Sequence, residues 1–384
     1  MARLTLFSRY LPRSCPRQVS AARRYATASS TPDGASQQRL DNHVKLVEVG
    51  ARDGLQNEKK SIPLATKIDL IERLAKTGLS SIEAGAFVSP KWVPQMNNSG
   101  EILEHILQHD IPSRSPLTFS FLAPNLKGLD SASAILAKHP TAFETETQRL
   151  ASAAAEGSSG PHKPALEIAV FAAATESFSQ KNLNCSVATS LERFGEVIRA
   201  AKDADLRVRA YISVVLGCPF EGYDVNPHRV AEIATDFLEM GADEIALGDT
   251  TGMGTAPRTK DLLNCLRKAG IRNEDIAMHF HNTYGQALVN TVVALEHGIR
   301  TFDSSVGGLG GCPYSPGASG NVATEDMVYF LESLGMDTGV DLDAVADIGA
   351  WITNEVGKPH DSSVGKAVLA ARLRTKEEGK AGEA

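Results

Sequence analysis

His279 and His281 are the side chains in this sequence that are best spaced to act together. They lie in the apolar stretch DIAMHFHN, which is typical of a strand. Alternate residues of a strand project to the same face, so both imidazoles point one way and Phe280 points the other. Two imidazoles can share a divalent cation, and an added carboxylate and amide oxygen favour Mg²⁺ or Mn²⁺. Asp53 is the candidate carboxylate and Asn321 the candidate amide.

Charged residues follow other apolar stretches in the same way. Arg52 precedes Asp53 in an R-D-G turn, and a guanidinium fixed beside a cation can stabilise a developing oxyanion or enolate. Glu83 can pair with Arg52, either as a structural ion pair or with a direct catalytic role. Asp249, in LGDTTGMGT, can accept a hydrogen bond from a histidine or cap the helix that follows.

The stretch GGLGGCPYSPGASGN (307–321) contains six glycines, two prolines and a single cysteine, Cys312. Glycine permits backbone conformations that other residues avoid. Such a stretch is either a long surface connection or a segment that folds over a bound substrate and excludes water.

Eight short apolar runs alternate with helical patterns such as VAEIATDFLEMG and LVNTVVALEHG. This alternation predicts an α/β fold, a TIM (β/α)8 barrel, with a doubly wound open sheet as the alternative. In a barrel the first and last strands adjoin, which brings Asp53 close to the two histidines. The predicted strands are 44–50, 81–87, 117–124, 166–174, 208–217, 243–249, 275–282 and 300–308.

The composition limits the class of protein. The chain has 384 residues, of which 42% are hydrophobic and 22% charged, as in ordinary globular proteins. Its net charge of -7 argues against a nucleic-acid partner. It lacks an apolar run of about 18 residues, so we expect no membrane-spanning helix. The five cysteines show no C-x-x-C spacing, which favours free thiols.

The chain divides into four predicted parts. Residues 1–28 are rich in arginine and serine and lack acidic residues, which predicts a mitochondrial transit peptide and a location in the matrix; a disordered basic tail is the alternative. A linker at 29–42 leads to a catalytic barrel at 43–335. An Ala/Ser/Thr-rich insertion at about 138–164 is expected to be exposed and without chemistry. Residues 336–384 are expected to form C-terminal helices that pack on the barrel and end in a frayed charged tail.

Five stretches carry a family resemblance, which runs from about residue 43 to near residue 370. Together they resemble the hydroxymethylglutaryl-CoA lyases, most specifically in the cysteine-containing stretch. The sequence departs from the family pattern in three places. It has the insertion at about 138–164, and Asn282 replaces an aspartate. It also has no cysteine after Cys312, which argues against a thiol switch that pairs Cys312 with a C-terminal cysteine. The matching stretches are GARDGLQNEK (50–59), SIEAGAFVSPKWVPQM (81–96), LGDTTGMGT (247–255), HFHNTYGQAL (279–288) and GGLGGCPYSPGASGNVATEDMVY (307–329).

The resemblance implies cleavage of an acyl-CoA substrate, 3-hydroxy-3-methylglutaryl-CoA, to acetyl-CoA and acetoacetate by a homodimer with one Mg²⁺ or Mn²⁺. An acetyl-CoA-dependent condensing acyltransferase and a catalytically silent metal-binding scaffold are the alternatives. The base that takes the hydroxyl proton stays open between two residues. The implied roles are metal ligands Asp53, His279, His281 and Asn321; base Asp53 or His279; enolate stabiliser Arg52, with Glu83 beside it; proton donor Cys312; and supporting or substrate-binding residues Gln56 and Asp249.

Overall fold

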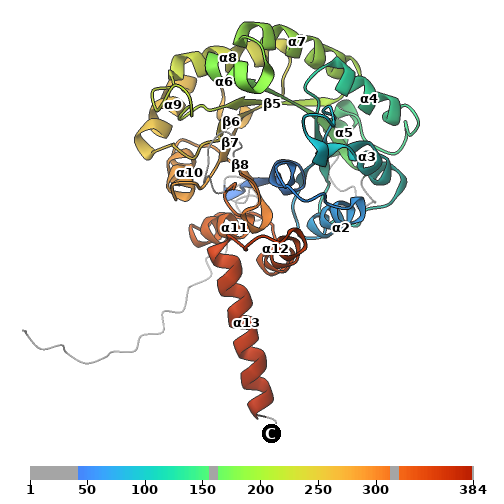
Figure 1. The fold of residues 1–384 in the computed structure, drawn as a ribbon, viewed down its shortest axis with the longest axis vertical. Coiled ribbons are helices and arrows are strands. Elements are labelled where there is room, and N and C mark those ends of the chain that lie inside the picture. Colours follow the sequence, from blue (N-terminus) through green and yellow to red (C-terminus); the bar gives the residue numbers. More distant parts are fainter. Residues whose placement is uncertain (1–41, 155–162, 312–319, 383–384) are drawn as a thin grey trace, which may run out of the picture. The chain divides into compact units, whose positions relative to one another are not determined.

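The fold is a closed barrel of eight parallel strands, seen in a computed structural model that describes residues 42–154, 163–311 and 320–382. Each strand pairs with the next along the chain, and β8 pairs with β1, which closes the ring (Figure 1). The barrel prediction is confirmed, and the open sheet is excluded by the β1–β8 pairing. The strands are β1 Lys45–Glu48, β2 Ser81–Ala86, β3 Thr118–Leu122, β4 Ala165–Ala173, β5 Arg207–Ser213, β6 Glu244–Asp249, β7 Ile276–Phe280 and β8 Thr301–Ser304.

Amphipathic helices cover the outside of the barrel (Figure 1). In α7 (Val187–Asp203) the Ser186 side chain caps the first turn, and Phe194 faces the sheet, with its ring 5.9 Å from that of Phe171 on β4. This packing buries the apolar outer face of the strands. The other covering helices are α2 Leu64–Ala75, α3 Ser99–Gln108, α4 Leu126–Leu136, α8 Pro227–Met240, α9 Ala256–Lys268, α10 Ala287–Glu296 and α11 Thr324–Ser333, with the short α6 Glu176–Leu183.

Ion pairs occupy much of the barrel interior, where bulky branched side chains are usual. Arg209 of β5 is buried and lies 2.7 Å from Glu244 of β6 and 2.6 Å from Asp303 of β8. Arg207, one inward position lower on β5, pairs with Glu167 of β4 at 2.9 Å. A buried charge without a partner is costly, so this network of opposite charges is what makes a charged interior compatible with folding.

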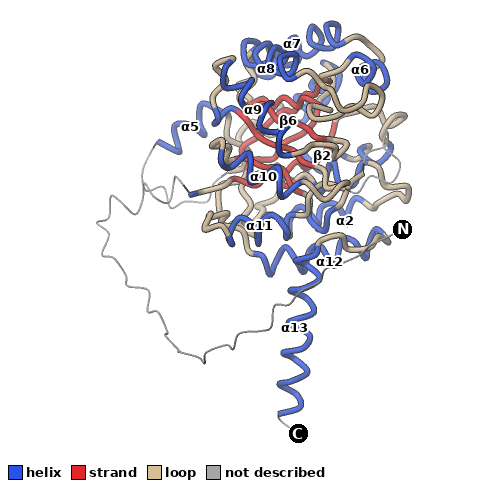
Figure 2. Tube along the Cα trace, turned by 90° about the vertical axis from the view of Figure 1, so that its left-hand side faces the viewer, coloured by secondary structure: helices blue, strands red, loops and turns tan. Residues whose placement is uncertain are grey.

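The insertion at 138–164 contains a helix, α5 (Glu146–Ala154), that the sequence did not predict (Figure 2). The helix begins against the turn before β5, where the Thr147 hydroxyl donates to Asp205 at 2.9 Å. Glu146 also lies 3.9 Å from Arg207. The start of the insertion is therefore anchored at the amino-terminal ends of the strands, and residues 155–162 lie outside the described part of the chain.

Two further helices follow the barrel, as predicted for the C-terminal part. Helix α12 (Leu342–Val356) packs against α2, where the Arg73 guanidinium stacks over the Trp351 ring at 4.3 Å. Helix α13 (Ser363–Gly382) begins beside α11 and α12 and continues to Gly382, through a segment that we expected to fray (Figure 1). In the described residues, no helix is long and apolar enough to cross a membrane. The predicted leader and all but the last residue of the linker, 1–41, lie outside those residues.

Candidate metal and catalytic site

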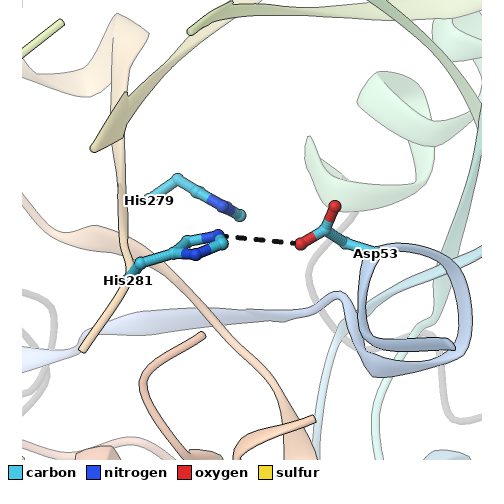
Figure 3. A group of neighbouring side chains, drawn as sticks. All are labelled: Asp53, His279 and His281. Carbon is cyan, nitrogen blue, oxygen red and sulfur yellow. Dashed lines mark ion pairs between the residues drawn. The ribbon is translucent and has the colours of Figure 1, made fainter. Parts of the chain in front are cut away.

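The two histidines and Asp53 meet at the carboxyl ends of the strands, where active sites of barrel enzymes lie. His279 is on β7, His281 follows that strand, and Asp53 lies in a π-helical turn, η1 (Gly50–Gly54), after β1. Figure 3 shows the three side chains converging, and one ligand atom from each lies within 4.8 Å of the others. The predicted grouping of these residues is therefore confirmed.

Asp53 is held by hydrogen bonds to both of its carboxylate oxygens. Oδ1 accepts from the side chains of Arg52 and Gln56, each at 2.8 Å. Oδ2 accepts from the side-chain amide nitrogen of Asn321, Nδ2, also at 2.8 Å. Burial opposes the charged form, but the charges of Arg52 and the two histidines and the Asn321 bond outweigh it and lower the pKa of Asp53 to about 2. The carboxylate is thus anionic and fixed in direction at neutral pH.

His279 is oriented by a residue that the sequence analysis did not single out. Its Nδ1 lies 3.0 Å from Oδ2 of Asp303, which stands opposite it on β8. Asp303 is in turn held by two bonds from Arg209, at 2.6 and 3.1 Å. A carboxylate at Nδ1 places the proton there and leaves Nε2 as the nitrogen that can bind a cation. Alternation along 300–308 would have put Asp303 on the inward face, which is the signal that was available.

His281 and Asn321 are among the residues of the site that have buried polar atoms without a hydrogen-bond partner. Both ring nitrogens of His281 and the Oδ1 of Asn321 are buried and have no hydrogen-bond partner. Burial, followed by the positive charge of His279 and opposed by Asp53, lowers the pKa of His281 to about 4, so its imidazole is neutral near pH 7. Buried polar atoms without a partner are rare and point to a ligand. Two imidazoles, a carboxylate and an amide oxygen therefore fit one divalent cation.

Arg52 is fixed beside this group by Glu83. The Arg52 guanidinium lies 2.6 Å from Glu83 Oε2 and 2.8 Å from Asp53 Oδ1. The Tyr211 hydroxyl also donates to Glu83, at 3.1 Å, and its ring lies 5.4 Å from the Arg52 guanidinium. Burial raises the pKa of Glu83, and the pairing with Arg52 opposes this shift. The predicted Arg52–Glu83 pair is present, and the Arg52 Nε is buried without a partner.

Asp249 contacts a loop and not a histidine side chain. The sequence left two roles open for Asp249, a hydrogen bond to a histidine and capping of the next helix. In the structure its Oδ2 accepts from the Gly254 backbone amide at 2.9 Å, just before α9, which is nearer to the capping role. Its own backbone carbonyl accepts from the His281 amide at 3.3 Å. Burial raises the pKa of Asp249 to about 7. The carboxylate that hydrogen-bonds to His279 is Asp303, and the one beside His281 is Asp53, at 3.9 Å from its Nε2.

Glu48, at the end of β1, supports the turn that carries Asp53. The sequence did not predict this role. Its carboxylate accepts from the amides of Gly50 and Val306, at 2.8 and 3.0 Å, and from the Thr324 hydroxyl at 2.6 Å. Burial raises its pKa to about 7. These bonds join the turn that carries Asp53 to the segments on either side of the cysteine-containing stretch. Cys312 itself lies outside the described residues.

The fold and the site together define a class, the TIM-barrel proteins with a buried metal-binding site at the carboxyl ends of the strands. Residues 43–352 match the HMGL-like family model. The chain belongs to this family, the hydroxymethylglutaryl-CoA lyases.

Similar proteins share most of the chain. The 3-hydroxy-3-isohexenylglutaryl-CoA/hydroxy-methylglutaryl-CoA lyase of Pseudomonas aeruginosa is 48% identical over 86% of this chain and 99% of its own. The mitochondrial hydroxymethylglutaryl-CoA lyase of Macaca fascicularis is 43% identical over 95% of this chain and 99% of its own. A solved structure of an HMG-CoA lyase from Acinetobacter baumannii, in complex with coenzyme A and 3-methylmalate, is 32% identical, with a TM-score of 0.71, over 85% of this chain and 96% of that one.

Proposed function

We propose that this protein cleaves 3-hydroxy-3-methylglutaryl-CoA to acetyl-CoA and acetoacetate. The observation that carries the proposal is the buried group of Asp53, His279 and His281, with Arg52 fixed at its edge. The matching lyases from bacteria and a primate cover this barrel almost from end to end. The group combines a place for a cation with a fixed positive charge, which is what carbon–carbon cleavage through an enolate requires.

The proposed cofactor is one Mg²⁺ or Mn²⁺, held by Asp53, His279, His281 and Asn321. When bound, such a cation lowers the pKa of a coordinated hydroxyl and so favours loss of its proton. The unpaired nitrogens of His281 and the unpaired Oδ1 of Asn321 support this assignment. Mixed nitrogen and oxygen donors around an ion that keeps open positions suit both metals.

The proton of the 3-hydroxyl passes to Asp53 or to His279. Asp53, whose pKa is about 2, is anionic at all neutral pH values but is a weak base. His279 is held at Nδ1 by Asp303, and its Nε2 is the nitrogen assigned to the cation, so His279 can accept the proton only if Nε2 is not coordinated at that step. A comparison of Asp53→Asn and His279→Asn by their pH–rate profiles tests which residue sets the basic requirement.

Arg52 stabilises the thioester enolate that leaves when the carbon–carbon bond breaks. The guanidinium is held on two sides by Glu83 and Asp53, and so is preorganised for the charge that develops. Cys312 then protonates the enolate carbon. An ordinary thiol, with a pKa of about 8.5, is mostly protonated near neutral pH and can make this donation.

The remaining proposals concern partners and location. An acyl-CoA is the proposed substrate, in keeping with the relative whose solved structure holds coenzyme A.

We propose a homodimer in the mitochondrial matrix, delivered by a transit peptide at 1–28. The arginine-rich composition of 1–28 and the mitochondrial relative from Macaca fascicularis support this location. A fluorescent protein fused after residue 42 tests it, because the first 42 residues suffice for mitochondrial import only if they contain the leader.

The test of the activity is to identify the products. Purified protein is incubated with 3-hydroxy-3-methylglutaryl-CoA and Mg²⁺ or Mn²⁺, and acetoacetate and acetyl-CoA are measured in parallel. We expect both products in equal amounts, and little of either with Asp53→Asn. If acetoacetate does not form with either metal, the proposal is wrong; acetyl-CoA consumption with a 2-oxo acid would indicate a condensing enzyme instead.

A further inference from the structure

The segment between α12 and α13, residues 357–362, docks on the connection that leaves β8 for the metal site. The Asp361 amide donates to the Gly307 carbonyl at 3.1 Å, and the Ser362 hydroxyl donates to Asp326 of α11 at 2.7 Å. Helices α11 and α12 lie side by side below the barrel in Figures 1 and 2. A part of the chain that contributes no barrel strand therefore contacts the start of the glycine-rich stretch.

Gly307 and Gly308 have a backbone conformation that other residues rarely adopt. Their φ angles are +67° and +69°, in the left-handed region that favours glycine. The Gly307 amide donates to both oxygens of Glu325, each at 3.0 Å, and Glu325 is fully buried. The amide of Gly307 and its carbonyl are thus held from opposite directions by Glu325 and Asp361.

His360 completes this arrangement. Its Nε2 lies 3.4 Å from Oε1 of Glu325, a close approach without a hydrogen bond, because both ring nitrogens are buried and have no hydrogen-bond partner. The side chain is only 11% exposed. Two helical glycines provide the space for the imidazole: a Cβ at Gly349 would lie 2.8 Å from the His360 Nε2, and one at Gly365 would lie 2.9 Å from the same atom. A Cβ at Gly349 would also clash with Oε1 of Glu325. Glycine is unfavourable within a helix, so its presence at both positions indicates that the carboxylate and the ring have to fit there together.

The same connection reaches the metal-binding group through Leu309. The Leu309 carbonyl accepts from the side-chain Nδ2 of Asn321 at 3.2 Å. The same nitrogen also donates to Asp53 Oδ2 at 2.8 Å. The conformation of Gly307 and Gly308 determines where the Leu309 carbonyl lies, and hence how the Asn321 side chain is turned.

We propose that His360 is a positioning residue for the metal site, because its imidazole lies against Glu325 where that carboxylate binds the Gly307 amide, and so sets the Leu309–Asn321 contact. The inference depends on the proposed function only in requiring that the site binds a cation. It gives the C-terminal segment a role in the site beyond packing, although His360 does not touch Asp53 or either histidine of the pair.

The test compares His360→Ala and His360→Gln with the wild type. Mn²⁺ binding is measured by calorimetry, turnover by acetoacetate formation, and amide exchange by mass spectrometry on a peptide covering 305–311. We expect His360→Ala to weaken Mn²⁺ binding by about tenfold, to lower kcat with little change in KM, and to speed exchange in that peptide. His360→Gln, which keeps a polar N–H group beside Glu325, should recover most of both values. His109→Ala, at the exposed histidine that follows α3, is the control and should match the wild type.

Wild-type Mn²⁺ affinity and kcat in His360→Ala would overturn the inference, whatever its melting temperature. If His360→Ala does not fold, His360→Gln and His360→Leu, which keep side-chain volume, decide the matter: equal Mn²⁺ affinity in the two would also overturn it. A wild-type protein that binds Mn²⁺ and forms no acetoacetate would contradict the proposed function alone, because the binding comparison does not depend on turnover.

Discussion

His279 and Asp303 face each other across neighbouring strands, and the histidine Nδ1 lies 3.0 Å from the aspartate Oδ2. The strand register makes the contact, since the two residues are direct partners in the pairing of β7 with β8. Arg209 holds Asp303 from the other side. The tautomer of His279 is therefore set by the barrel itself and not by a mobile loop.

Asp303→Asn should weaken Mn²⁺ binding by about 10- to 100-fold, the usual loss when the partner of a metal-binding histidine is removed. The amide can no longer accept the Nδ1 proton as a charged group, and Arg209 loses one of its two carboxylate partners and keeps Glu244. Calorimetric titration with Mn²⁺ measures the change. Asp275→Asn, which removes a partly buried carboxylate paired with Arg272 just before β7, is the matched control. Equal affinity in Asp303→Asn and the wild type would show that Asp303 does not support the site.

Arg52→Lys should lower kcat by about 10²- to 10³-fold while leaving Mn²⁺ affinity within a few-fold of the wild type. Lysine keeps the charge but cannot contact Glu83 and Asp53 together as the guanidinium does. Glu83→Gln should show a smaller loss of kcat, because Arg52 stays charged but is less well fixed. Steady-state kinetics and calorimetry on the same preparations separate the two effects; a loss confined to metal binding would contradict the role of Arg52 in stabilising the enolate.

Much of the fold and the centre of the site followed from the sequence, for identifiable reasons. Alternating apolar runs predicted the strands, and strand alternation placed His279 and His281 on one face. Barrel closure then brought Asp53 to them. Each step used a local pattern together with one rule of topology.

The missed residues depend on long-range register. Asp303 and Glu48 look ordinary in sequence, and their roles appear only when neighbouring strands are aligned. The interior ion pairs were also missed, although Arg207 and Arg209 alternate on β5 in the way that inward-facing residues do. Helix α5 was missed because its Ala/Ser/Thr-rich segment lacks a clear apolar stripe.

Glu48→Gln should change how stability depends on pH. The native carboxyl keeps its proton up to about pH 7, whereas the unfolded chain releases it near 4.5. Between these values the unfolded state binds fewer protons, so the wild-type free energy of unfolding falls as pH rises. Relative to the wild type, the variant should therefore gain about 2 kcal/mol between about pH 5.5 and pH 7.

Urea unfolding of both proteins at the two pH values checks this expectation. Glu296→Gln serves as the control, because Glu296 is exposed and its replacement removes no buried carboxyl group. Parallel pH dependence in Glu48→Gln and the wild type would mean that Glu48 does not keep its proton in the folded protein.

Cys312→Ala should lower turnover by about 10²- to 10⁴-fold, the usual contribution of a positioned proton donor. Metal affinity should be unchanged, since the four proposed ligands remain. Cys265→Ala, at a buried cysteine of α9, is the control and should keep wild-type turnover. If Cys312→Ala turns over like the wild type, the thiol is not the donor, while the metal site is unaffected.

The most direct test of the account is a Mn²⁺ titration of metal-free protein in which binding and acetoacetate formation from 3-hydroxy-3-methylglutaryl-CoA are followed together. We predict that one Mn²⁺ binds per chain, that activity rises in proportion to occupancy, and that His281→Ala loses both. Cleavage at the full rate in metal-free protein, or binding that His281→Ala leaves intact, would contradict the claim that Asp53, His279 and His281 hold the cation that the reaction needs.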